Sequence, residues 1–155
     1  MTRYFLDTEF NEFGGDLISL ALVCEDGQRE LYVSTPCERP GAWVKENVIP
    51  ILKCPGADPI EVEPDQIGHA IAMFLHDDKM PTIISDWPDD IRYFCQAVIT
   101  GPGEMVNIPR LQFQMLRMDA YPTDLPGAVQ HNALWDARAL RHVFFPAVVS
   151  GAKEP

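Results

Sequence analysis

The sequence opens with the stretch Arg3-Tyr4-Phe5-Leu6-Asp7-Thr8-Glu9-Phe10, which decides the fold because it places two acids in a strand of the core. Successive side chains of a β-strand point to opposite faces, so Asp7 and Glu9 share one face. Two carboxylates on one face of a core strand are costly unless a cation lies beside them. The alternative is a solvated strand end, since a chain with 23 acidic residues should show about one Asp-x-Glu match by chance.

The residues that follow predict two further strands beside the first. Asp16–Cys24 is almost continuously apolar, which is typical of a strand buried at the centre of a sheet. The pair Asp26-Gly27 is a hairpin turn signal, and the short segment Glu30–Val33 follows it. The start of the chain therefore predicts an antiparallel meander of three strands.

Helices and strands alternate in the remainder of the chain. The pattern predicts a short helix at Ala42–Val48, a helix from Pro64 to Leu75, a strand at Thr82–Ser85 and a helix at Asp89–Thr100. A strand at Arg110–Gln114, a polar loop at Ala120–Gln130 and a helix from Asn132 to just before Pro146 follow. This order predicts one α/β domain over residues 1–155. We expect a mixed five-stranded sheet, three antiparallel strands and then parallel ones, flanked by helices. That is the architecture of the ribonuclease H-like fold.

The composition is that of a globular protein. A hydrophobic fraction of 46% in 155 residues allows one full core. No segment reaches the roughly 18 consecutive apolar residues of a membrane-spanning helix, and no signal-peptide pattern precedes the first strand. The four cysteines show no Cys-x-x-Cys spacing, which favours reduced thiols and a cytoplasmic location over disulfides or a zinc site.

The negative charge lies in the first hundred residues. Residues 1–100 contain 7 Lys and Arg against 18 Asp and Glu, which accounts for the net charge of −11, and residues 101–155 contain five of each. Nucleic-acid-binding proteins usually have a basic face, so affinity for long duplex DNA should be poor. Acids committed to metal binding do not repel a phosphate once cations are in place, and a short substrate end remains compatible with this composition.

Two later motifs add candidate ligands at the ends of predicted elements. Asp86 directly follows the strand at Thr82–Ser85, and ligands collect at the carboxyl ends of parallel strands. In the segment His131-Asn132-Ala133-Leu134-Trp135-Asp136, the histidine lies in the loop and Asp136 lies one turn into the helix. A near-neutral pKa suits His131 to accept a proton from water.

Each of these residues alone has an ordinary structural explanation. Asp86 could be a solvated loop acid, Asp136 a helix-surface acid and His131 a surface histidine. Trp87 could stack on a base or sugar, worth about 1–3 kcal/mol, or it could fill the core. The conjunction of the motifs, each at the end of a core element, favours one site with four carboxylates and a histidine. Oxygen ligands without thiolates favour Mg²⁺ or Mn²⁺, and two such ions about 4 Å apart suit phosphodiester hydrolysis.

The chain resembles the DEDDh branch of the DnaQ-like 3′→5′ exonucleases at five positions: Asp7, Glu9, Asp86, His131 and Asp136. The resemblance covers essentially the whole chain. It is nearest to small stand-alone bacterial exoribonucleases, whose chains begin with a similar Asp-Thr-Glu-Phe segment. Phe10 stands where the family's common pattern continues with Thr-Thr-Gly, so we expect Phe10 to supply stacking to the terminal nucleotide there.

The resemblance implies a two-metal mechanism. Asp7, Glu9 and Asp136 would hold one ion, and Asp7 would bridge to a second ion that Asp86 supports. His131 would deprotonate the attacking water. The substrate would be the 3′ end of single-stranded RNA or of short oligonucleotides, and the products would be nucleoside 5′-monophosphates.

Two alternatives and one question of assembly remain open from the sequence. A DNA-directed, proofreading-type 3′→5′ exonuclease is one alternative, because RNA recognition depends on 2′-hydroxyl contacts that sequence does not place. A non-catalytic nucleic-acid-binding or protein-binding module on the same fold is the other. The apolar segment Val143–Val149 covers either a partner or the chain's own core, and we expect a symmetric homodimer.

Overall fold

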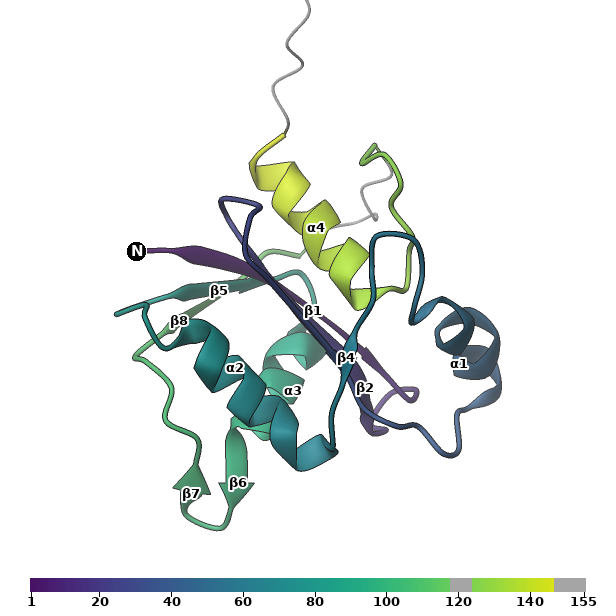
Figure 1. Ribbon diagram of the computed structural model, residues 1–155, viewed down its shortest axis with the longest axis horizontal. Helices are drawn as coiled ribbons and strands as arrows, with labels where there is room; N and C mark the ends of the chain where they lie inside the picture. The colour runs from purple at the N-terminus through teal and green to yellow at the C-terminus, as the bar shows by residue number, and fades with distance from the viewer. Residues whose placement is uncertain (118–123, 147–155) are drawn as a thin grey trace, which may run out of the picture.

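A mixed sheet forms the middle layer of the protein, with its strands in the order β4-β3-β2-β1-β5-β8 (Figure 1). The computed structural model describes residues 1–117 and 124–146. The strands are β1 at Arg3–Phe10, β2 at Leu17–Cys24, β3 at Glu30–Ser34, β4 at Ile60–Glu61, β5 at Thr82–Ser85 and β8 at Gln112–Met115. β1, β2 and β3 pair antiparallel, whereas β5 and β8 extend the sheet in parallel from β1, and β4 pairs in parallel with β3.

The predicted meander followed by parallel strands is confirmed, but the predicted count of five strands is wrong. The sheet of the described residues has six strands, because β4 joins its outer edge. β4 consists of two exposed residues, which are too few to produce a periodic pattern in the sequence. A small hairpin of β6 (Ile99–Gly101) and β7 (Glu104–Met105) lies where the predicted third helix was expected to end.

Helices cover both faces of the sheet. α4 (Ala133–Phe144) packs on one face, and α2 (Ile67–Leu75) and α3 (Pro88–Val98) pack on the other (Figure 1). α1 (Ala42–Asn47) packs against Ile18 of β2. Short 3₁₀ turns at Ile49–Ile51 and Pro64–Gln66 follow α1 and precede α2.

The alternation of β1 between the two cores determines where its acids point. Tyr4 and Leu6 are fully buried in the core beneath α2 and α3, and Phe5 is fully buried in the core beneath α4. By the same alternation, Asp7 and Glu9 point to the side of α4, and Thr8 points to the side of α3. The apolar half of β1 thus anchors the strand, and its acidic half projects beyond the α4 core.

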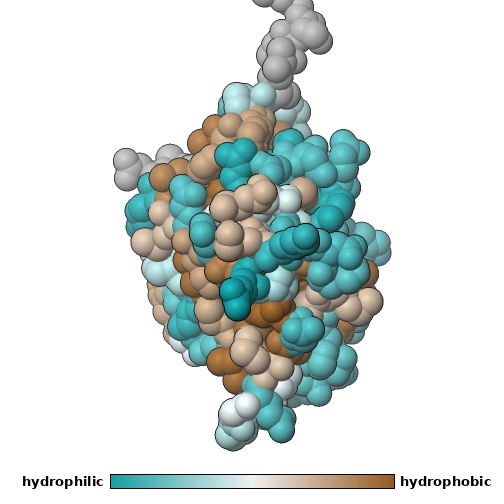
Figure 2. Space-filling model, turned by 90° about the vertical axis from the view of Figure 1, so that its left-hand side faces the viewer, coloured by the Kyte–Doolittle hydropathy of each residue, from teal (hydrophilic) through white to brown (hydrophobic). Residues whose placement is uncertain are grey.

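Apolar residues are exposed at one edge of the sheet. Figure 2 presents the face that carries the free edge of β8, on which apolar and hydrophilic residues are intermixed. Exposed apolar residues of this edge include Phe113 and Met115. Val143 is 46% exposed, and the rest of the segment Val143–Val149 lies partly outside the described residues, so the homodimer stays a prediction. No helix in the described ranges is long and apolar enough to cross a membrane.

Candidate active site

β1 delivers two acids to the site through a local irregularity. Glu9 is opposite Ser19 in the register with β2, whereas Phe10 is opposite Leu17, so the pairing shifts between Glu9 and Phe10. Such bulges bend a strand and change the direction of a side chain, and they are frequent next to functional sites. Asp7 and Glu9 remain on one face of the sheet, the side of α4, and the sequence predicted that they share a face.

The segment before α4 is held in one conformation by Asn132. This residue is 1% exposed and caps the helix, because its side-chain oxygen accepts a hydrogen bond from the Trp135 backbone N at 3.1 Å. Its Nδ2 donates to the Ile51 carbonyl oxygen at 2.9 Å and to the Tyr32 hydroxyl at 3.1 Å. Asn132 had no predicted role, although asparagine is a preferred capping residue at the start of a helix.

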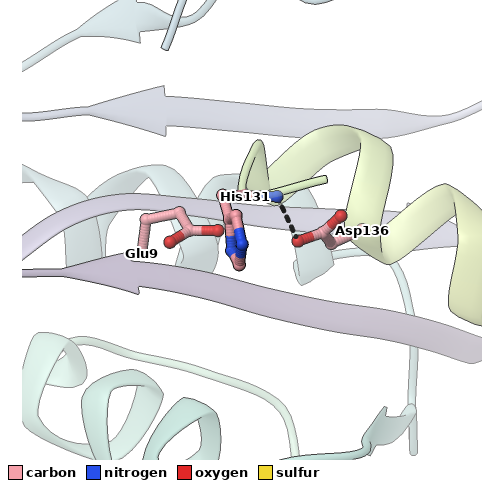
Figure 3. Close-up of side chains that lie close together, drawn as sticks. All are labelled: Glu9, His131 and Asp136. Carbon is pink, nitrogen blue, oxygen red and sulfur yellow. Dashed lines mark hydrogen bonds between the residues drawn. The ribbon is translucent and has the colours of Figure 1, made fainter. Parts of the chain in front are cut away.

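His131 and Asp136 are fixed relative to each other on either side of this cap. The Asp136 carboxylate accepts a hydrogen bond from the His131 backbone N at 3.0 Å (Figure 3). His131 has a φ of 66°, in the left-handed region that is uncommon for residues other than glycine. The capped helix and this hydrogen bond maintain the strained backbone, and Figure 3 shows the imidazole turned toward the carboxylate of Glu9.

The structure brings all five predicted residues together in two neighbouring groups. Glu9, His131 and Asp136 each offer a ligand atom within 4.8 Å of the others. Asp7 and Asp86 form the second group with Asp90, with the same spacing limit of 4.8 Å. Asp7 interacts electrostatically with the acids of both groups. The two groups therefore form one acidic centre, which is the arrangement that the motifs predicted.

Asp90 is the member of this centre that sequence reasoning missed. Its side chain is 2% exposed and accepts hydrogen bonds from the Thr8 backbone N at 3.1 Å, the Thr8 hydroxyl at 2.6 Å and the Ser85 hydroxyl at 2.7 Å. It precedes the buried residues Phe94 and Val98 by four and eight positions on α3. An acid on the buried stripe of an amphipathic helix was the available signal.

Burial and mutual repulsion raise the carboxyl pKa values throughout the centre. Burial raises the pKa of Asp7 well above its usual range, and the negative charges of Asp90 and Asp136 add to the effect. Burial and the charge of Asp136 act in the same way on the pKa of Glu9. The pKa of Asp86 is raised by burial, and burial raises that of Asp90 to about 7.

The residues present fit divalent metal ions. The Asp7 Oδ2 atom is buried and has no hydrogen-bond partner among the described residues, so it is an acceptor without a donor. A cation among the carboxylates would offset both their desolvation and their repulsion. The donor set consists of carboxylate oxygens and one imidazole, which suits Mg²⁺ or Mn²⁺ rather than a thiolate-preferring metal.

Aromatic side chains flank the acidic centre and include both predicted stacking residues. The half-buried Phe10 ring stacks on Tyr93, with ring centroids 4.9 Å apart. The Trp87 ring lies under the Arg117 guanidinium at 4.3 Å. Phe13, which is 81% exposed and was not predicted, connects the two because its ring centroid lies 6.2 Å from Phe10 and 6.4 Å from Trp87. We call Phe10, Phe13 and Trp87 the aromatic rim.

A second unpredicted contact holds the histidine ring. Trp43, at the start of α1, packs edge-to-face on His131 with ring centroids 4.9 Å apart, and its indole is 50% exposed. Burial lowers the pKa of His131, which favours the neutral imidazole. A neutral imidazole with a fixed ring beside buried carboxylates can accept a proton, which is the chemistry of a general base.

The fold and the site together define an α/β protein with a partly buried centre of carboxylates and one histidine. No protein-family model matches the chain. The chain is 33% identical over 152 residues to the 3′-5′ exoribonuclease Rv2179c of Mycobacterium tuberculosis (strain ATCC 25618 / H37Rv). The aligned region covers 88% of this chain and 87% of that protein. The identity and the coverage are the same for the 3′-5′ exoribonuclease MT2234.1 of Mycobacterium tuberculosis (strain CDC 1551 / Oshkosh). The chain belongs to the family of these 3′-5′ exoribonucleases.

Proposed function

We propose that this protein is a 3′→5′ exoribonuclease that releases nucleoside 5′-monophosphates from single-stranded RNA or short oligoribonucleotides. We assign it to the DEDDh branch of the DnaQ-like exonucleases and to the ribonuclease H-like fold. The convergence of the two acidic groups around His131 carries the proposal, because a phosphodiesterase that uses two metal ions requires such a centre. The family relationship with proteins named 3′-5′ exoribonucleases supports the reaction and the RNA substrate.

Each acidic group would hold one ion. Glu9 and Asp136, with Asp7, would hold the first, and Asp7 with Asp86 and Asp90 would hold the second. Two bound Mg²⁺ or Mn²⁺ ions would supply a nucleophile at neutral pH and stabilise the charge on the leaving oxygen. Asp90 enters this assignment on its position alone, in addition to the residues that the sequence predicted.

His131 would accept the proton of the attacking water. Its lowered pKa keeps the ring able to accept a proton in neutral solution, and Trp43 holds the orientation of the ring. The hydrogen bond from its backbone to Asp136 keeps the base at a constant distance from the first acidic group. Positioning of this kind accounts for much of the acceleration in phosphoryl chemistry.

The aromatic rim would contact the bases at the 3′ end of the substrate. Phe10 follows Glu9 directly, and Trp87 follows Asp86, so both rings begin next to a candidate metal ligand. Stacking on an aromatic ring is worth about 1–3 kcal/mol per base and accepts any base. With a net charge of −11 the protein has little long-range attraction for polyanions, which supports short single strands as substrates.

A time course with 5′-labelled RNA and DNA oligomers tests this function. We expect a ladder that shortens by one nucleotide at a time from the 3′ end in Mg²⁺ or Mn²⁺, no cleavage in EDTA, and faster cleavage of RNA. Asp7→Asn should abolish cleavage, whereas Asp77→Asn, which removes an acid exposed beside His76, should not. Faster cleavage of DNA would favour the proofreading-type alternative. Metal binding without cleavage of either strand would favour a binding module.

A further inference from the structure

A cavity separate from the acidic centre lies beside the C-terminal half of α4. Its volume is about 480 Å³, within the range of about 300–1,000 Å³ that is typical of small-molecule sites. The hairpin between β2 and β3 and the loop after residue 124 complete its wall. The lining residues that determine its chemistry are Glu30, Leu125, Trp135, Arg138, Arg141 and His142. None of the residues of the acidic centre lines this cavity.

Two of the three basic residues of the cavity already face an acid. Arg138 pairs with Glu30 through two hydrogen bonds of 2.6 and 2.7 Å. His142 lies 3.4 Å from the carboxylate of Asp124. Arg141 donates from Nε to the Glu25 carbonyl oxygen at 3.0 Å, but it forms no ion pair with a carboxylate of the described residues. Within residues 1–117 and 124–146, Arg141 is thus the basic residue of the cavity that has no carboxylate partner, in a chain whose net charge is −11.

The Arg141 guanidinium lies against the hairpin turn between β2 and β3. Gly27 lies in the hairpin turn with a φ of +70°, and a Cβ atom at that position would lie 2.9 Å from the Arg141 guanidinium carbon. Glycine suits the positive φ of this turn and leaves room for the guanidinium in its present position. The hydrogen bond to Glu25 fixes one side of the group, so its remaining N–H donors are already oriented when a ligand arrives.

Part of the cavity lining is apolar. Trp135 is anchored by a hydrogen bond from its indole N–H to the Pro55 carbonyl oxygen at 3.2 Å, and the Arg138 guanidinium covers its ring at 4.6 Å. Leu125 and Phe145 add apolar surface. A guanidinium without a carboxylate partner among the described residues, next to aromatic and aliphatic walls, is suited to a small molecule with an anionic group and a flat apolar body.

We propose that this cavity binds a nucleotide without metal, with the phosphate at Arg141 and the base or sugar against Trp135 and Leu125. The choice of a nucleotide among aromatic anions rests on the proposed function, which releases nucleoside 5′-monophosphates. The nucleotide could come from two sources, the free product or a residue within the RNA strand. Both present the same phosphate and base to the cavity.

The test is isothermal titration calorimetry with adenosine 5′-monophosphate in EDTA, which removes metal-dependent binding at the acidic centre. We expect the wild type to bind the monophosphate saturably. Its affinity for adenosine should be lower by about tenfold or more, because adenosine lacks the charged group that accepts hydrogen bonds from Arg141. Arg141→Gln should weaken binding of the monophosphate by about tenfold or more. Arg110→Gln, which removes the same charge from an exposed loop position, should not weaken it.

A second variant protects the test against a folding defect in Arg141→Gln. Leu125→Glu leaves the hydrogen bond of Arg141 intact and adds a negative charge to the cavity wall, so it should weaken binding to a similar degree. Competition by a pentaadenylate without terminal phosphates would identify the strand as the source, and lack of competition would identify the free product. No binding by the wild type, or equal binding by wild type, Arg141→Gln and Leu125→Glu, would overturn the proposal.

The exonuclease assay on the same preparations separates the two proposals. An active enzyme that binds no monophosphate in EDTA overturns the cavity assignment alone. A protein that binds the monophosphate but cleaves no oligomer in Mg²⁺ overturns the proposed function. We expect Arg141→Gln to cleave a dinucleotide at the wild-type rate, because Arg141 lies outside the acidic centre.

Discussion

Asp90 connects the architecture of the protein to its chemistry within one side chain. Its two oxygens hold Thr8 of β1 and Ser85 of β5 to the start of α3, and the same carboxylate belongs to the second acidic group. Because burial raises the pKa of Asp90 to about 7, part of the population carries a protonated Asp90 at neutral pH without a cation. A bound divalent ion would favour the ionised form, so this residue couples metal binding to the packing of two strands and a helix.

Asp90→Asn should separate the charge of this residue from its packing. The amide has nearly the same shape, its oxygen can still accept from Thr8, and its NH₂ can donate to the Ser85 hydroxyl. We expect the fold to be retained and the Mg²⁺ concentration for half-maximal rate to rise about 10–100-fold, as for other groups that support metal ligands. A Mg²⁺ titration of activity measures this. Asp89→Asn, which removes an acid paired with Arg92, is the control, and wild-type Mg²⁺ dependence of Asp90→Asn would contradict the assignment.

His131→Ala should affect the chemical step more than metal binding. Loss of a general base slows a reaction by about 10²–10⁴-fold, and we expect single-turnover hydrolysis to slow to this extent while Mn²⁺ binding is retained. Burial lowers the pKa of His131, so the ring stays neutral to a lower pH than an ordinary histidine. The wild-type rate should therefore fall only when the pH drops below the usual titration range of histidine. His69→Ala, on the exposed face of α2, is the control. A variant that loses Mn²⁺ instead would identify His131 as a ligand.

Strand alternation and element ends explain which site residues the sequence could predict. Asp7 and Glu9 follow from period two along β1, and Asp86 and Asp136 follow from the ends of β5 and the start of α4. Asp90 required a different argument, because an acid in the first turn of a helix is ordinarily a favourable charge near the helix dipole. The sequence signal for Asp90 was its place on the apolar stripe of α3, and tertiary packing brings that stripe against Thr8.

At the scale of elements, the start of α4 is the unit that positions the candidate base. Asn132→Ala should remove the cap, which is worth about 1 kcal/mol, and leave the Ile51 carbonyl without its donor, for a total loss of about 1–3 kcal/mol in the free energy of unfolding. The rate should also fall, because His131 and Asp136 lie on either side of the cap.

Thermal unfolding and single-turnover hydrolysis measure these two effects. Asn47→Ala is the matched control, because the Asn47 Nδ2 donates an exposed hydrogen bond to the Trp43 carbonyl oxygen. This substitution should change the free energy of unfolding by less than about 0.5 kcal/mol. An unchanged rate in Asn132→Ala, together with reduced stability, would show that the cap supports the helix without positioning the base.

The elements that the sequence missed share a physical cause. β4 and β7 are two residues long and exposed, and β6 is three residues long, so each is held by pairing with a distant or adjacent strand and not by its own apolar pattern. The strand predicted at Arg110–Gln114 begins two residues before β8 and ends one residue before it, at an exposed edge where no buried face fixes the ends. Strands with a buried face, such as β1 and β2, have a strong pattern and were located within a residue.

At the scale of the whole molecule, a buried acidic centre links stability to pH and metal. The folded protein raises the pKa values of Asp7, Glu9, Asp86 and Asp90, so it binds protons that the unfolded chain releases. Stability from these groups is fully present below the usual carboxyl range and is lost as the pH rises through the folded pKa, which is about 7 for Asp90. The metal-free protein should therefore become less stable between about pH 4.5 and pH 7.5.

Divalent metal should reverse this trend, because it binds the ionised carboxylates of the folded protein only. A free ion at a hundredfold excess over its dissociation constant would stabilise the fold by about 2.7 kcal/mol, and this gain should be largest near neutral pH. Calorimetric unfolding in EDTA and in Mg²⁺, at about pH 5 and about pH 7.5, measures both slopes. Asp90→Asn should flatten the slope in EDTA, since one of the titrating groups is gone. A metal-free protein whose stability instead rises over this range would mean that the carboxylates are compensated within the fold, and the centre would then have no need of cations.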